Sequence, residues 1–150
     1  MNKTKPIKVI FFDLGDTLVT ADRKWISGAP EILHQLKEGG IRLGVISNTG
    51  TLPRAQVLEQ LPQNFDLQLF ETKLVLFSSE TTIEKPSPAI FNLAVTKSGV
   101  AANECLFCTE NLLHTLAAQA VGMRAARLLP PPGGDLLSLL DTLKAYKALI

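Results

Sequence analysis

The chain has 150 residues, of which 46% are hydrophobic, and 15 Lys and Arg against 14 Asp and Glu residues leave a formal charge of +1. This length predicts a single domain over residues 1–150 that buries a sizeable core, and it excludes a core joined to a second, substrate-binding domain. No basic stripe indicates a nucleic-acid partner, and no apolar segment approaches the about 20 residues that span a bilayer, so we expect neither nucleic acid nor membrane as a partner.

Short apolar runs alternate with helical patterns along the chain. The basic start, residues 1–6, leads into a short run rather than the long one of a signal peptide, so we expect a cytoplasmic protein. Strands are predicted at residues 7–12, 41–46, 74–77, 104–108 and 124–128, and helices at 30–38, 52–61, 87–98, 111–121 and 135 to about 149. The order predicts an α/β fold, a doubly wound, Rossmann-like, mostly parallel five-stranded sheet with helices on both faces and no cap domain.

The helix at 111–121 repeats apolar residues at positions 112, 113, 116, 117 and 120, which is the spacing of an amphipathic helix. Before it, Cys105 and Cys108 fall in a predicted strand, where positions three apart face opposite sides of the sheet. A zinc site lacks further ligands at suitable spacing, because the chain has only two histidines, His34 and His114. We therefore interpret the two cysteines as buried structural thiols.

A carboxylate ends the first predicted strand, in the segment Asp13-Leu14-Gly15-Asp16-Thr17. Open α/β sheets place their ligands and their chemistry at the carboxyl ends of the strands. Gly15 lets the backbone turn sharply, and Thr17 offers a hydroxyl beside it. Asp13 taken alone fits two interpretations: a ligand of Mg²⁺ or nucleophile toward phosphorus, and a residue that caps a strand-to-loop turn.

Three further segments carry polar residues after a strand or before a helix. They are Val45-Ile46-Ser47-Asn48, then Glu84-Lys85-Pro86-Ser87-Pro88, then Leu106-Phe107-Cys108-Thr109-Glu110 with Ala117-Ala118-Gln119-Ala120-Val121-Gly122-Met123 after it. Together with the first segment, their order and spacing resemble the four motifs of the haloacid dehalogenase-like (HAD) hydrolase superfamily, most of whose members are Mg²⁺-dependent phosphatases. The resemblance covers residues 7–128 and implies the same fold.

The resemblance implies three catalytic residues. Asp13 would be the nucleophile that forms an aspartyl-phosphate, Ser47 would hydrogen-bond phosphate oxygens, and Lys85 would steady the nucleophile and the transferring phosphoryl group. In that case the Lys85 ammonium should lie within roughly 4 Å of the Asp13 carboxylate. The alternatives are an ordinary turn at Ser47 and a solvated lysine before a helix.

The resemblance also implies a binding set and a metal. Asn48 and Thr17 would contribute to substrate binding, while Mg²⁺ would be held by Asp13, the backbone carbonyl of Gly15 and Glu110. For Glu110 a second interpretation stays open, namely that it only favours the start of the following helix through the helix dipole.

Three positions depart from the family pattern. Gly15 stands where the general acid/base is expected, and Asp16 comes one residue too late, while Thr109 and His114 stand where carboxylates are expected. We therefore expect a slow phosphatase, because general acid–base help is typically worth about 10²–10⁴ in rate. The alternative is a catalytically impaired protein of this fold that serves as a binding or regulatory module.

The spacing between the motifs leaves the expected site open. Asp13 and Ser47 are 34 positions apart and Ser47 and Lys85 are 38 apart, and each interval must hold a helix, so no cap domain fits. Trp25 in the loop 19–29 either covers the site or packs beneath the loop, and we favour packing. An open site suits a phosphorylated small molecule or a phosphoprotein, or a substrate covered by a neighbouring subunit of a homo-oligomer.

Overall fold

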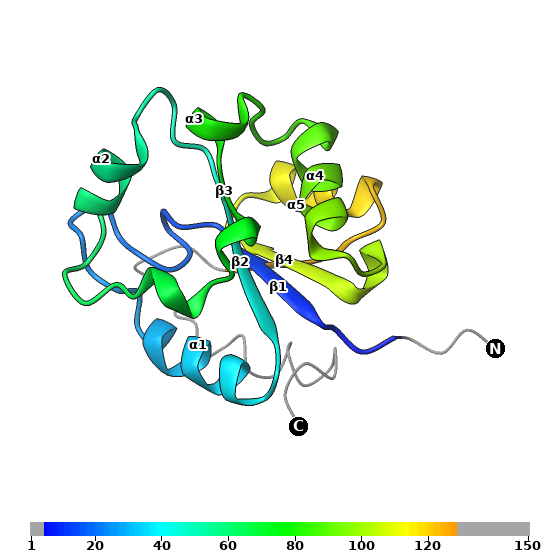
Figure 1. Ribbon diagram of the computed structural model, residues 1–150, viewed down its shortest axis with the longest axis horizontal. Coiled ribbons are helices and arrows are strands. Elements are labelled where there is room, and N and C mark those ends of the chain that lie inside the picture. The colour runs from blue at the N-terminus through cyan, green and yellow to red at the C-terminus, as the bar shows by residue number, and fades with distance from the viewer. Residues whose placement is uncertain (1–4, 129–150) are drawn as a thin grey trace.

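Five parallel strands form the centre of the molecule. The computed structural model describes residues 5–128 and contains the strands β1 (Val9–Phe12), β2 (Arg42–Ser47), β3 (Val75–Phe77), β4 (Cys105–Thr109) and β5 (Arg124–Arg127). Their order across the sheet is β3-β2-β1-β4-β5, and each neighbouring pair is parallel (Figure 1). The α/β fold expected from the sequence is confirmed, and the sheet is parallel throughout. Because the chain changes direction across the sheet between β3 and β4, the carboxyl ends of β1 and β4 form the crevice where such sheets bind ligands.

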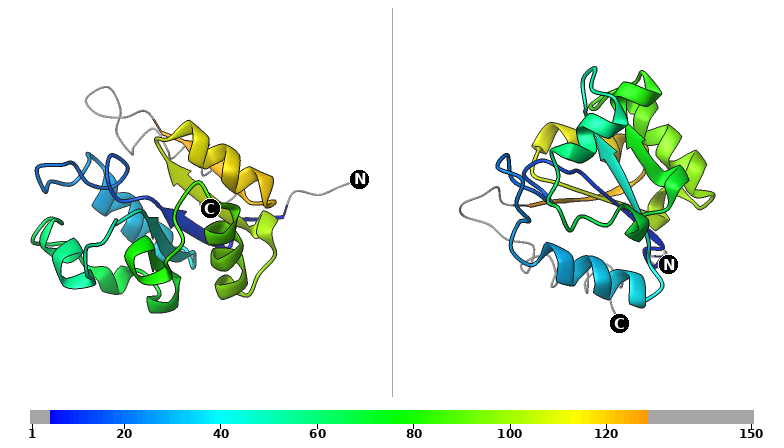
Figure 2. Two further views of the ribbon diagram at one scale, coloured as in Figure 1. Left: turned by 90° about the horizontal axis from the view of Figure 1, so that it is seen from above. Right: turned by 60° about the vertical axis from the view of Figure 1, so that its left-hand side comes forward.

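Helices cover both faces of the sheet (Figure 2). They are α1 (Ala29–Glu38), α2 (Arg54–Glu59), the single turn α3 (Ser78–Thr81), α4 (Pro88–Ser98) and α5 (Leu112–Ala120). The predictions at 30–38, 87–98 and 111–121 match α1, α4 and α5 closely, and Ser87 and Asn111 cap the last two through their side chains. The helix predicted at 52–61 is shorter because Pro53 precedes its first turn. The short α3 was not predicted, and the helix predicted from residue 135 lies outside the described residues.

The core consists of two apolar layers, one on each face of the sheet. Ile32, Leu33 and Leu36 of α1 pack in one layer, and Ile90, Phe91 and Ala94 of α4 pack in the other. Close packing extends to the strands, since a Cβ added to Gly44 of β2 would lie 2.6 Å from the Phe11 ring. β1 is buried along its whole length, which fixes the position of the residues that follow it.

The apolar side of α5 faces away from the sheet, which the sequence pattern alone did not reveal. Leu112, Leu113 and Leu116 are 48%, 65% and 51% exposed, whereas Thr115 and Ala118 are the buried residues of this helix. The small side chains, three positions apart, let α5 approach β4 and β5 closely. An amphipathic pattern shows that a helix has two sides, but the packing of the sheet decides which side is covered.

The two cysteines and Trp25 lie as expected. Cys105 and Cys108 are buried free thiols in opposite core layers, and burial raises the pKa of both. Trp25 packs beneath its loop, since its ring stacks on Phe65 at 5.0 Å and its Nε1 donates to Asn64 Oδ1. Within residues 5–128 we find neither an inserted cap between the motifs nor a helix long and apolar enough to cross a membrane.

Candidate functional site

Three neighbouring strands bring polar residues to one edge of the sheet. Asp13 directly follows β1, Ser47 ends β2 and Thr109 ends β4. Phe12 is in register with Val45 on one side and with Cys108 on the other. The carboxylate therefore lies between the ends of its two neighbours, in the crevice at the switch in strand order.

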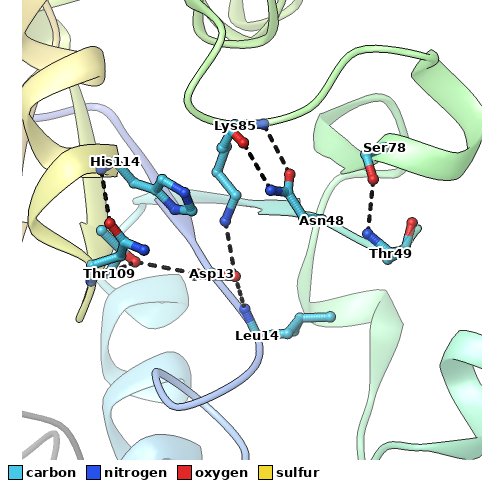
Figure 3. Close-up of polar contacts among 9 residues, drawn as sticks. Asp13, Leu14, Asn48, Thr49, Ser78, Lys85, Thr109 and His114 are labelled. Atoms are coloured by element: carbon cyan, nitrogen blue, oxygen red, sulfur yellow. Dashed lines mark hydrogen bonds and ion pairs between the residues drawn. The ribbon is translucent and has the colours of Figure 1, made fainter.

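Lys85 and Asp13 form a buried ion pair at the centre of this edge (Figure 3). The Lys85 Nζ lies 3.0 Å from Asp13 Oδ1, and the two side chains are 1% and 11% exposed. Burial lowers the pKa of Lys85, and the Asp13 carboxylate opposes that shift. The ion pair confirms the expected proximity of the two residues. A charge pair this buried is costly to maintain for stability alone, and such pairs are frequent in active sites.

Asn48 holds the backbone of Lys85. Its Oδ1 accepts from the Lys85 N–H and its Nδ2 donates to the Lys85 carbonyl, both at 2.9 Å (Figure 3). The Asn48 side-chain amide is engaged with residue 85, while Asn48 also lines a cleft beside this site, so its expected contact with substrate stays a prediction that falls to its backbone. The structure makes Asn48 a positioning residue that fixes where the Lys85 side chain begins.

The remaining contacts of Asp13 fix the orientation of its carboxylate. The backbone N–H of Leu14 donates to Oδ1 at 2.8 Å, and the Thr109 hydroxyl donates to Oδ2 at 3.2 Å. Thr109 thus replaces an expected carboxylate with a hydroxyl that hydrogen-bonds the candidate nucleophile. The sequence indicates only a missing carboxylate at Thr109, because this hydrogen bond joins residues 96 positions apart.

His114 also reaches this site, from the first turns of α5. Its imidazole projects toward Lys85 (Figure 3), and its buried Nδ1 has no hydrogen-bond partner among residues 5–128. Partial burial, followed by the positive charge of Lys85, lowers the pKa of His114. The neutral imidazole is therefore favoured at neutral pH. The sequence showed only that a carboxylate is missing here.

The residues expected to bind a metal, Asp13, Gly15 and Glu110, lie close to several charges at this edge. Burial, followed by the charges of Asp13 and Asp16, raises the pKa of Glu110. Within the described part of the chain, no backbone N–H donates to the Gly15 carbonyl, and no cluster of three or more His, Cys, Asp or Glu could hold a metal. Two mutually repelling carboxylates and a free carbonyl fit Mg²⁺, which takes one or two carboxylates and keeps several waters.

A cleft of about 590 Å³ opens beside these residues. Gly15, Ser47 and Asn48, which lie at the carboxyl edge of the sheet, are among the residues that line it. Thr17 does not belong to this surface: it is 1% exposed, and its hydroxyl has no partner among the described residues. The turn after Asp13 buries the Thr17 side chain, and the expected role of Thr17 in substrate binding stays a prediction.

A second set of hydrogen bonds supports the loop after β2. The Thr49 N–H donates to Ser78 Oγ at 2.8 Å, and the Ser79 N–H donates to Thr49 Oγ1 at 3.0 Å. These bonds connect the end of β2 to α3, which precedes the Lys85 loop. The sequence carried no signal for them beyond the high content of Ser and Thr.

Residues 4–128 match the family model described as haloacid dehalogenase-like hydrolase. A ribulose-1,5-bisphosphate 5-phosphatase from Halopiger xanaduensis is 28% identical over 131 residues, which are 81% of this chain and 53% of that protein. A phosphoglycolate phosphatase from Xanthomonas campestris pv. campestris is 27% identical over 109 residues, 72% of this chain and 47% of that protein. The chain thus spans about half the length of these curated relatives.

Solved structures share the fold at low sequence identity. An uncharacterised protein from Listeria monocytogenes serotype 4b superposes with a TM-score of 0.73 at 18% identity, covering 95% of this chain and 100% of that one. A HAD family enzyme from Bacteroides thetaiotaomicron, in complex with magnesium and inorganic phosphate, gives a TM-score of 0.68 at 16% identity, covering 83% and 96%.

Proposed function

Since this chain belongs to the haloacid dehalogenase-like hydrolase family, we propose that it is a slow, Mg²⁺-dependent phosphatase that acts through an aspartyl-phosphate on Asp13. The observation that carries this proposal is the buried ion pair between Asp13 and Lys85 at the carboxyl edge of the sheet. The phosphatases among its relatives support the same reaction class.

The first step transfers the phosphoryl group to the protein. An oxygen of Asp13 bonds to phosphorus while the bond from phosphorus to the ester oxygen breaks, and the leaving alcohol takes up a proton. Lys85, held by Asn48, keeps a positive charge beside the transferring group, and Ser47 donates its hydroxyl to a phosphate oxygen. Bound by Asp13, Glu110 and the Gly15 carbonyl, Mg²⁺ would neutralise charge on the phosphate.

The second step hydrolyses the aspartyl-phosphate. Water attacks phosphorus, the bond to the Asp13 oxygen breaks, and inorganic phosphate and a proton are released. Gly15 has no side chain that could take this proton, so we expect this step to be slow. The first step also lacks a general acid that would protonate the leaving alcohol. Activated aryl phosphates should therefore be the best substrates, because their leaving groups need little protonation.

Phosphate release and acid-stable labelling together test this proposal. Wild-type protein should release phosphate from 4-nitrophenyl phosphate with Mg²⁺ and stop when a chelator removes the metal. Asp13→Asn should abolish both turnover and the hydroxylamine-sensitive label left by an acyl phosphate. Asp22→Asn is the matched control, because Asp22 is an exposed carboxylate on the loop that follows the same strand. Equal activity in the Asp13→Asn protein would refute the proposal.

The second candidate function is a binding or regulatory module without turnover. Three positions favour it, since Gly15, Thr109 and His114 stand where the family usually has carboxylates. Beryllium fluoride with Mg²⁺ should raise the thermal stability of a working phosphatase by RT ln(1 + [L]/Kd), since it mimics the phosphoryl group on Asp13. Stabilisation by inorganic phosphate without any covalent label or turnover would favour the module instead.

A further inference from the structure

The cleft beside Asp13 has a polar end near the sheet and a wall of mixed character that includes several apolar side chains. From Gly15, Ser47 and Asn48 it extends between the loop after β1 and the segment around α2. Apolar side chains line this part, namely Val19, Ala21, Leu52, Val57 and Leu61, together with the polar residues Thr20, Thr49 and Gln60. Its volume of about 590 Å³ falls in the range of small-molecule sites. A phosphate at Asp13 would therefore direct the rest of a small substrate along this wall.

Charge is scarce in the lining of the cleft. Asp16 and Arg23 are the only charged residues among those that line it in the described part of the chain, and Asp16 is close to the candidate metal ligands. Arg23 is the remaining charge, and it also lines the neighbouring hollow formed by Leu58, Pro62 and Phe65. The cleft thus offers one cation to whatever part of a ligand extends away from Asp13.

A tight turn displays Arg23. The Thr20 N–H donates to the Lys24 carbonyl, and the Arg23 N–H donates to the Thr20 carbonyl, at 2.8 and 3.2 Å. Arg23 has a φ of 64°, a left-handed conformation that a side chain adopts only where the surrounding turn fixes it. The turn also engages Asp22, which accepts from the Thr20 hydroxyl and pairs with Lys24. Within residues 5–128, Asp22 forms its ion pair with Lys24 and none with Arg23.

Arg23 differs from the other arginines in its lack of partners. Arg42 pairs with Glu71 and Arg54 with Glu80, while Arg124 and Arg127 donate to backbone carbonyls. Within residues 5–128, the guanidinium of Arg23 has neither an ion pair nor a hydrogen bond. An unpartnered guanidinium in the lining of this cleft is suited to bind an anion in two parallel hydrogen bonds.

We propose that the substrates are small phosphomonoesters that carry a carboxylate on an apolar body, and that Arg23 is the residue that recognises this carboxylate. The inference rests on the proposed function, because it places the phosphate at Asp13 and the apolar body against Leu52, Val57 and Leu61. A single guanidinium, with no second unpaired cation in the lining among residues 5–128, matches the single charge of a carboxylate better than a second phosphate.

Two aryl phosphates of matched size test this inference: phenyl phosphate and 4-carboxyphenyl phosphate. We expect wild-type protein to prefer the carboxylated compound by about tenfold in kcat/KM, a preference that falls as ionic strength rises. Arg23→Gln should remove the preference. Lys24→Gln should keep it, since Lys24 is a cation of the same turn that is paired with Asp22. Equal rates for the two compounds in wild-type protein, or a preference that survives in Arg23→Gln, would overturn the inference.

Binding of the matching phosphonates separates this inference from the proposed function. Phenylphosphonate and 4-carboxyphenylphosphonate cannot be hydrolysed, and calorimetry gives their dissociation constants for each variant. Tighter binding of the carboxylated compound that depends on Arg23, without turnover of either phosphate, would support the specificity while refuting the phosphatase. Turnover of both phosphates without discrimination would refute only the specificity. If neither phosphonate binds, the inference is refuted.

Discussion

Introducing a carboxylate at position 15 tests whether the missing general acid/base is what limits the activity of this site. The turn has room for it: a Cβ added to Gly15 meets nothing within 4 Å, and the backbone of Gly15 lies outside the left-handed region. Gly15→Asp should therefore fold, with a change in stability of about 1 kcal/mol or less. Asp16, the next residue, does have a φ of 60°, so it cannot be exchanged as freely.

The new side chain would project into a site that already repels negative charge. Burial, followed by the charges of Asp13 and Asp16, raises the pKa of Glu110, and the same two charges should raise the pKa of a carboxyl at position 15. A carboxyl that titrates closer to neutral pH is a better proton donor and acceptor. General acid–base help is typically worth about 10²–10⁴, so we expect at least a tenfold gain in phosphatase activity even with Thr109 unchanged.

The assay compares an activated with an unactivated substrate. Gly15→Asp should raise the rate more for a phosphorylated aliphatic alcohol than for 4-nitrophenyl phosphate, because the poorer leaving group depends more on protonation. Gly15→Asn is the matched control, since it has nearly the same size and cannot transfer the proton. An equal gain in both variants, or a folded Gly15→Asp protein without any gain, would refute the reasoning. So would wild-type hydrolysis of unactivated esters at ordinary enzyme rates.

Three further changes probe the ion pair and the metal ligands. Lys85→Met leaves the buried Asp13 carboxylate unpaired, so we expect the free energy of unfolding in urea to fall by about 3 kcal/mol. Adding Asp13→Asn should recover part of this loss. The activity of Lys85→Met should fall about 10²-fold or more. Thr109→Asp adds a carboxylate beside Asp13 and should lower the Mg²⁺ concentration that gives half-maximal activity; an unchanged value would contradict a metal at this edge. The raised pKa of Glu110 means that the folded state binds its proton more tightly than the unfolded chain. Stability should therefore fall as the pH rises above the ordinary value of 4.5, and Glu110→Gln or added Mg²⁺ should weaken this fall in a series of thermal melts.

The sequence predicted the parts of this protein that depend on local pattern. Apolar runs without alternation predict buried parallel strands, which places Asp13 at the carboxyl edge of the sheet, whereas the position of Lys85 beside it is implied only by the resemblance to the HAD motifs. The side-chain contacts between distant segments could not be derived in this way. An asparagine at position 48 is a residue type that often binds ligands, yet its side-chain amide hydrogen-bonds the backbone of Lys85, 37 positions later. Thr17 has the same ambiguity, because only the path of the turn decides whether its hydroxyl faces the cleft.

The reciprocal hydrogen bonds between Asn48 and Lys85 couple the loop after β2 to the loop before α4, so in protein engineering the two loops must be exchanged together. Transplanting the Lys85 loop from a relative into this chain would bring a new backbone path against the same amide, which accepts only one spacing of donor and acceptor. A recombined protein would therefore need both loops from the same parent. The natural crossover points for chimeras of this fold lie outside the segment from 48 to 85, and libraries that exchange the two loops independently should lose their active members.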